Sequence, residues 1–465
     1  MGKIFPRAVC RNQNRLHRSR KERLPETPVL LVFTPAKEAY MSSIHSMILN
    51  YRKSSRSVNA TLILLMLNFL IFSGCGKNPE PRKRQGTLDT PAHHALRGQD
   101  LLQQKRWNAA EKQFDSALEL DPEFAPALSG KSLVKAHQSN QPGRKSERVE
   151  ALREESKDYL EKAVNLAETP EHQMRIRIDA IRVETQLKDD DWLEQTRDHY
   201  GEALELVEDQ PSLRKRLSEV NFYMGEAFLA ARAFSDASGH YARVLELNQG
   251  FTREADRQHA LVQKIVRAQP GSPYAREVSL VSEISRADLS ALLIEEFQLE
   301  SLYQRGVKKD ASGKKFKSPV KKFETTQTNK LADATDIEDH PLREDIELVL
   351  QLKVRGLEAN PQHLFFPNRR ITRAEYAMML EDILIKVTQD KGLSTRFLGD
   401  RSPWSDVRSD AYYYNAARTL TSRGILEVRN SIRGEFGPDD PVHGADVLLS
   451  LRLLKDELKS YVRGS

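Results

Sequence analysis

A pattern of small and large apolar residues at helical spacing occurs twice in this chain, 127 residues apart, and constrains its fold more than any other feature. Small residues let two antiparallel helices approach closely, while aromatic residues fill the space between one hairpin and the next. We therefore predict stacked helical hairpins over residues 92–250. The residues predicted to pack in this way are Gly98, Trp107, Ala110, Phe114, Gly225, Phe234, Ala237 and Tyr241.

These two copies resemble tetratricopeptide repeats. Between them, "DYLEKAVNLAETP" and "HYGEALELVEDQP" repeat the end of the second helix, which makes about four helix pairs. The large anchor residues Phe114, Leu160, Tyr200 and Tyr241 are 46, 40 and 41 residues apart, so the helices or loops are longer than is usual in that family. The resemblance implies a concave surface for a protein or peptide partner, whose identity the residues do not reveal.

A second repeat occupies the carboxy-terminal third. Residues 335–386 run from an Asp-Ile start through an apolar helix and a Gly turn to "FFPNRRITRAEYAM", and residues 404–455 follow the same order to "FGPDDPVHGADVLL". A partial copy, "ISRADLSALLIEEF", lies within residues 255–297. These segments resemble S-layer homology (SLH) domains, which implies a three-part bundle. The predicted fold is all-α, a tetratricopeptide-type hairpin array followed by an SLH-type bundle.

The helix start in the second SLH-like segment carries an arginine that needs an explanation. Thr372 and Glu375 have the spacing of a capping box, but Arg373 is not needed for the cap and is unfavourable against the helix dipole. The resemblance implies that this arginine faces a groove between units and binds acidic, often pyruvylated, cell-wall glycan. Arg286 has the same place in the partial unit, whereas Gly444 stands there in the last unit. A solvated surface residue or an internal ion pair are the alternatives.

Residues 41–74 have the layout of a secretory signal, with basic residues, a twelve-residue apolar run and small residues before Cys75. A membrane-spanning helix needs about 20 apolar residues, so the run is too short to span. The end of the segment resembles a bacterial lipoprotein signal, although Phe72 replaces the usual Leu. The resemblance implies cleavage before Cys75, its lipidation and a membrane anchor; a plain signal peptide and an uncleaved anchor remain alternatives. The same resemblance implies that an Asp after the cysteine favours retention in the inner membrane, so Gly76 at this place favours the outer membrane.

Three further segments are expected to lie outside the folded parts. Residues 1–40 form an Arg-rich tract that a signal peptide does not need, so we expect the working protein to start at Met41 or Met47. Residues 75–91, rich in Pro, Lys and Arg, are predicted to be a flexible tether. Residues 303–334, rich in Lys with few large apolar residues, are predicted to be a disordered insert.

Charge and composition exclude several classes of function. Residues 1–74 carry twelve Lys or Arg against three acidic residues, a net +9, which leaves −3 of the total +6 for the rest of the chain. A nucleic-acid-binding surface is therefore not expected. Two cysteines exclude a disulfide framework or a cysteine metal site. No phosphate loop, zinc-protease motif or nucleophile elbow occurs, so we expect no catalytic residues, no metal and no cofactor.

The sequence thus predicts a non-enzymatic lipoprotein of the cell envelope, anchored in the outer membrane and facing the periplasm. It would bind cell-wall glycan or peptidoglycan through the SLH-like units and an unidentified protein or peptide through the repeats. The alternative is an envelope assembly or secretion accessory factor that acts through the repeats without binding glycan. A glycan-processing enzyme would need a catalytic domain that the sequence does not show.

Overall fold

Helices make up the structure throughout the part of the chain that the computed structural model describes, residues 81–306 and 334–463. Within those residues, β-type pairing is limited to isolated bridges. The all-α prediction is confirmed. The predicted upstream tract 1–40, the signal segment 41–74 and the lipidation residue Cys75 lie outside the described residues.

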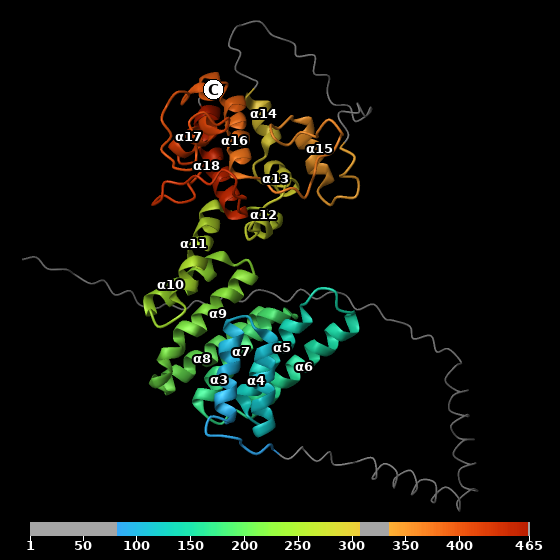
Figure 1. Cartoon of the computed structure of the whole chain (residues 1–465), viewed down its shortest axis with the longest axis vertical. Helices are drawn as coiled ribbons and strands as arrows, with labels where there is room; N and C mark the ends of the chain where they lie inside the picture. The colour runs from blue at the N-terminus through green and yellow to red at the C-terminus, as the bar shows by residue number, and fades with distance from the viewer. Residues whose placement is uncertain (1–80, 307–333, 464–465) are drawn as a thin grey trace, which may run out of the picture. The chain divides into compact units, whose positions relative to one another are not determined.

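Eight helices form four successive hairpins (Figure 1). The first helix of each hairpin packs against the first helix of the next, whereas no comparable packing joins the second helices of neighbouring hairpins. We call the first helices inner and the second helices outer. The pairs are α3 (Pro91–Gln103) with α4 (Trp107–Leu120), α5 (Ala125–Ser139) with α6 (Ser146–Asn165), α7 (Pro170–Leu187) with α8 (Trp192–Asp209), and α9 (Leu217–Ala230), preceded by the 3₁₀ turn η1 (Pro211–Arg216), with α10 (Phe234–Leu247).

The hairpins close because glycine faces an aromatic ring. Phe114 is fully buried, and a Cβ atom added at Gly98 or Gly130 would meet its ring at 2.5 and 2.3 Å. In the fourth hairpin, a Cβ at Gly225 would meet the Tyr241 ring at 2.7 Å. The predicted packing residues are accordingly buried, except for Trp107, which is partly exposed and stacks on His137 with ring centroids 3.7 Å apart.

Helix α11 (Thr252–Ala268) joins the array to the carboxy-terminal bundle. Its buried residues Ala255, Val262 and Ile265 belong to the apolar cluster of α9 and α10, and its Lys264 ammonium lies 2.7 Å from the Asp446 carboxylate on α18. Helix α11 therefore packs as part of the array and also contacts the bundle. The sequence predicted instead that residues from 255 onward belong to the partial SLH-like unit.

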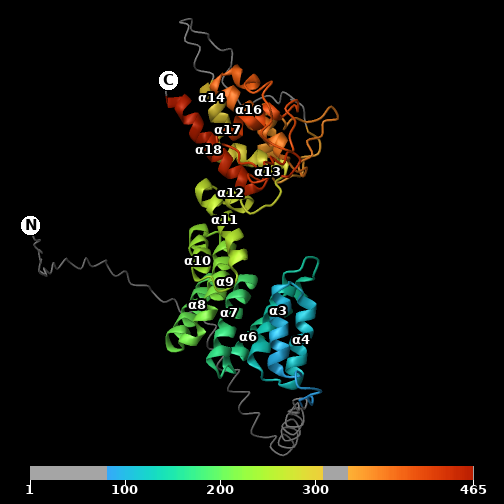
Figure 2. The same ribbon diagram turned by 60° about the vertical axis from the view of Figure 1, so that its left-hand side comes forward.

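The bundle consists of three consecutive units, 273–306, 334–388 and 404–463 (Figure 2). Their buried apolar residues form one continuous core. The Lys-rich insert was predicted from residue 303, but residues 303–306 complete α14 and Ala334 is buried; residues 307–333 lie outside the described part. The elements are α12 (Pro273–Val278), α13 (Arg286–Ala291), the π-helical turn η2 (Leu292–Glu296), α14 (Leu299–Gly306), α15 (Arg343–Gln351), α16 (Arg373–Thr388), the 3₁₀ turn η3 (Lys391–Thr395), α17 (Tyr414–Ser422) and α18 (Gly444–Arg463).

A closed ring of main-chain hydrogen bonds joins the three units at the residues just before α13, α16 and α18. The Ile284 amide donates to the Val442 carbonyl (3.0 Å), the Val442 amide to the Ile371 carbonyl (3.1 Å), and the Ile371 amide to the Ile284 carbonyl (3.2 Å). All three side chains are buried. The units are thus related by an approximate threefold arrangement, with the start of each motif helix at the centre.

The predicted tether is shorter than expected. The Arg82 amide donates to the Glu119 carbonyl (2.6 Å), and the Arg82 guanidinium forms two hydrogen bonds of 2.9 Å with the Asp89 carboxylate. Helix α3 is then capped by Thr90, whose hydroxyl accepts from the His93 amide. Residues 82–90 are therefore held against the first hairpin, so a flexible tether through residue 91 is wrong for this part.

We predict that Gly98→Ala and Gly130→Ala each lower the free energy of unfolding by about 1–3 kcal/mol, because the buried Phe114 ring has no room to move. Gly239→Ala is the matched control, since Gly239 is also helical but has no atom within 4 Å of its added Cβ. It should raise stability by about 0.5–1 kcal/mol through helix propensity. Urea unfolding of the three variants checks this; equal effects at all three glycines would contradict the packing.

Candidate functional site

The starts of α13 and α16 carry the same capping box. The Thr372 hydroxyl accepts from the Glu375 amide (3.3 Å), and the Glu375 carboxylate accepts from the Thr372 amide (3.1 Å). Ser285 and Asp288 make the equivalent pair of contacts at α13. The predicted capping role of Thr372 and Glu375 is confirmed.

Two aspartates shape the loops that lie opposite these helix starts. The Asp336 carboxylate accepts from the amides of Phe365 and Phe366, both at 2.7 Å. The Asp406 carboxylate does the same for Phe436 (2.9 Å) and for the glycine that follows it (2.7 Å). Each loop therefore turns its Phe carbonyl and ring toward the preceding unit, where the motif arginine begins its helix.

Arg286 fills the junction between the first and second units. Only 4% of it is exposed, and its Nε donates to the Phe365 carbonyl at 2.7 Å. Its two terminal nitrogens donate to the carbonyls of Gly356 and Glu358, and its guanidinium carbon lies 4.5 Å from the centre of the Phe365 ring. The residue thus links its helix to two places in the long loop between α15 and α16 of the next unit.

Arg373 makes the equivalent contacts between the second and third units. It is 7% exposed; its Nε donates to the Phe436 carbonyl (2.9 Å), its Nη2 donates to the Glu427 carbonyl, and its guanidinium lies over the Phe436 ring. The expectation that these arginines face an open groove is wrong, because the Phe loop of the following unit covers each of them. Whether either contacts glycan stays a prediction.

The two junctions differ in which nearby charge acts most strongly on the arginine, Arg369 on Arg286 and Asp446 on Arg373. Burial, and after it the positive charge of nearby Arg369, lowers the pKa of Arg286 to about 10. Burial also lowers the pKa of Arg373, but the carboxylates of Asp446, Asp440 and Glu427 act in the opposite direction. Both arginines stay protonated at neutral pH. Each arginine thus has three carboxylates and one further arginine nearby: Glu375, Glu358, Asp336 and Arg369 act on Arg286, and Arg429 is the further arginine at Arg373.

At the third junction, glycine replaces the arginine for a steric reason. A Cβ atom at Gly444 would lie 1.8 Å from the Val278 carbonyl oxygen, and the Gly444 amide donates to the Val281 carbonyl (2.9 Å). The amides of Arg286 and Arg373 make the corresponding 2.9 Å bonds at their own junctions. Helix α18 therefore contacts the first unit directly through its backbone, with no space for a side chain.

The inner helices of the hairpin array share a buried polar network that the sequence did not reveal. Asp179 on α7 is fully buried, and its carboxylate accepts from Gln99 on α3 (2.8 Å) and Ser129 on α5 (2.9 Å). Arg175 forms two hydrogen bonds with Glu219 on α9 (2.9 and 3.0 Å). This network joins all four inner helices through polar groups that lie between them.

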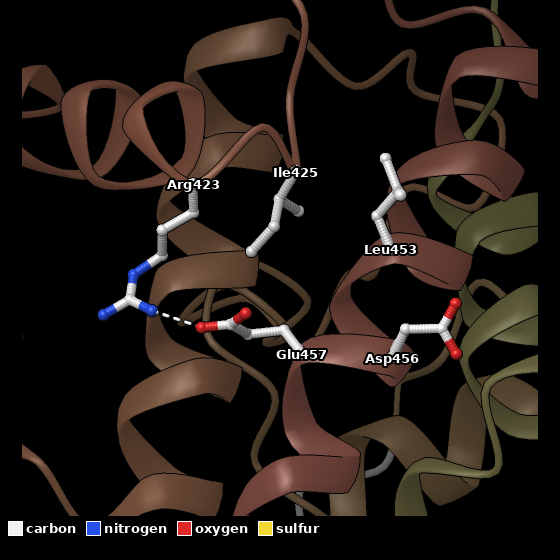
Figure 3. Close-up of a pocket in the computed structure, with 5 residues that line it drawn as sticks. All are labelled: Arg423, Ile425, Leu453, Asp456 and Glu457. Carbon is white, nitrogen blue, oxygen red and sulfur yellow. Dashed lines mark hydrogen bonds and ion pairs between the residues drawn. The ribbon is translucent and has the colours of Figure 1, made fainter.

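Two of the surface cavities in the described part of the chain lie between helices, one in the bundle and one in the array. One, of about 330 Å³, lies between α17 and α18 (Figure 3), where the Arg423 guanidinium pairs with the Glu457 carboxylate. Asp456, at its edge, pairs with Lys459 (2.7 Å), so this cavity offers little unpaired charge. The other, of about 260 Å³, lies between α6, α7 and α8.

Within residues 81–306 and 334–463, no group of three or more His, Cys, Asp or Glu side chains is arranged to hold a metal ion. None of the helices described there is long and apolar enough to cross a membrane. Comparison of the chain with models of protein families, with curated proteins and with solved structures finds no match in any of the three.

We predict that Arg373→Ala lowers the free energy of unfolding by about 2–4 kcal/mol, because it leaves buried carbonyls without a donor. Arg370→Ala, at an exposed cation nearby whose side chain is 67% exposed, should change it by less than about 0.5 kcal/mol. Thermal unfolding of both variants checks this. Equal stability of the two would mean that Arg373 is not structural.

Restoring the missing arginine should not strengthen the bundle. Gly444→Arg, and even Gly444→Ala, should lower the free energy of unfolding by about 3 kcal/mol or more, because the added Cβ collides with main-chain atoms of Val278. Chemical denaturation measures the change, with Asp439→Ala at an exposed position of the preceding loop as the control. A neutral or stabilising Gly444→Arg would contradict the observed third junction.

Proposed function

We propose that this chain is a non-enzymatic cell-envelope lipoprotein that holds a protein partner on its hairpin array and binds cell-wall glycan through its three-unit bundle. The resemblance of the two repeat patterns to tetratricopeptide repeats and SLH domains carries the assignment from sequence. The lipid anchor at Cys75 remains part of the proposal, since that residue lies outside the described part.

The observation that best supports a wall-binding bundle is the ring of hydrogen bonds among Ile284, Ile371 and Val442. The resemblance to SLH domains predicted three units, although only one of the three motifs is clear, one is decayed and one is partial. A partial motif that arose by chance would have no reason to occupy the same position in a closed ring as the other two. The ring therefore supports reading all three segments as one module.

The junction around Arg286 is the better candidate for an acidic glycan. Arg369 and Arg370 lie beside it with side chains 49% and 67% exposed, although each has a carboxylate neighbour. Phe366 is 46% exposed in the same loop, and an exposed aromatic ring beside guanidinium groups suits a sugar that carries a carboxylate. In the sequence these residues stand in the run "FFPNRR". The SLH motif requires neither its second Phe nor its two arginines.

The alternative, an assembly or secretion accessory factor without glycan binding, is favoured by the burial of both motif arginines. Their nitrogens already donate to main-chain carbonyls, so the bundle could serve only as a scaffold while the repeats bind the partner.

The test is co-sedimentation of residues 76–465 with isolated cell-wall sacculi. Wild type should bind saturably, and Arg369→Glu/Arg370→Glu should weaken binding at least about tenfold, since both exposed cations become anions. The matched control is Arg253→Glu/Arg257→Glu on α11, where two cations with side chains 84% and 71% exposed change in the same way. No binding by wild type would favour the accessory factor; equal loss in both variants would indicate general charge attraction.

A further inference from the structure

A groove in the array lies between the inner helix α7 and the outer helices α6 and α8, with a volume of about 260 Å³. Its floor is apolar, and its walls are polar. The floor residues are Val164, Ala167, Ile176 and Leu206, and the wall residues are Gln173, Arg177, Glu202, Glu205 and Asp209.

The walls of this groove are held in place by contacts among themselves. The Arg177 Nε lies 2.8 Å from the Glu202 carboxylate, and the Gln173 amide group donates to the Ala167 carbonyl at 3.1 Å. Ile176, on the floor, is 1% exposed. These contacts tie α7 to α8 and to the loop after α6, so the groove exists without an occupant.

The groove has an uncompensated negative charge on one wall. Helix α8 carries six acidic residues and a single arginine. Glu205 and Asp209 are exposed, stand one helical turn apart and face the groove. Within residues 81–306 and 334–463, neither side chain has a hydrogen-bond or ion-pair partner, whereas the charges of Arg177 and Glu202 neutralise each other.

We propose that this groove binds a lysine or arginine side chain from a basic segment of the partner protein. The aliphatic stem would lie on the floor of Ile176 and Leu206, and the cationic end would meet Glu205 and Asp209, as long basic side chains commonly do. The volume is below the range of about 300–1,000 Å³ typical of small-molecule sites, which suits one side chain better than a cofactor.

The unpaired carboxylates of the groove stand on an outer helix, α8, and differ in this from the buried polar groups of the inner helices. The polar groups of Asp179, Arg175 and Glu219 are used in the buried network among the inner helices, whereas Glu205 and Asp209 are unpaired. This inference rests on the proposed function only in that the array binds a protein. It names the face and the chemistry of the contact, which the resemblance to a repeat family does not provide.

The test measures binding of a dye-labelled hexa-arginine peptide to the full chain by fluorescence anisotropy at about 150 mM salt, where surface attraction between distant charges is screened. Glu205→Lys/Asp209→Lys should weaken binding at least about tenfold, and Leu206→Ala should weaken it by a smaller factor. The matched control, Glu147→Lys/Glu150→Lys, makes the same charge change at exposed positions of α6 outside the groove and should change affinity less than about threefold.

No binding by wild type, or equal losses in the two double variants, would overturn the groove proposal. Sacculus binding by the Glu205→Lys/Asp209→Lys variant should equal that of wild type, because the changes lie on the hairpin array. If the wild-type chain binds sacculi but not the peptide, the groove proposal is wrong and the envelope function stands. If it binds the peptide but not sacculi, the envelope function is wrong and the groove proposal stands.

Discussion

The closed ring of main-chain hydrogen bonds at Ile284, Ile371 and Val442 is the interaction on which the carboxy-terminal bundle depends. Each bond joins two units that are far apart in sequence, so the entropy of closing long loops must be offset before any of them forms. Because all three residues are buried, breaking one bond leaves an amide and a carbonyl without water or partner. The ring therefore favours having all three units in place together, including the one whose motif is incomplete.

Two residue types, arginine and glycine, occupy the helix-start position next to the ring, and each joins its helix to a neighbouring unit. Arg286 and Arg373 reach across to a Phe loop whose backbone an aspartate holds in place. Gly444 instead brings its backbone against Val278 directly. Arginine at this position thus has a structural explanation that does not involve a ligand. A binding test that removes it changes stability and binding together, so exposed neighbours such as Arg369 are more informative.

Sequence patterns predicted the features that depend on local rules. The capping box at Thr372 and Glu375 needs only residues three positions apart, and the helical spacing of Gly98 and Phe114 already implied a tight hairpin. The burial of Arg373 could not be predicted, because it depends on where Glu427 and Phe436 of another unit fold. The buried polar network among the inner helices was not predicted for the same reason. Its residues come from four helices, and in the sequence they look like ordinary charged and polar surface residues.

Amide hydrogen exchange at Ile284, Ile371 and Val442 tests the central claim, that the three units form one closed structure, most directly. If the ring is intact, the three amides should exchange only through unfolding of the whole bundle, with the same free energy of opening at each. Rapid exchange at one of them, with protection kept at the other two, would mean that one unit opens by itself and that the ring does not hold the bundle together.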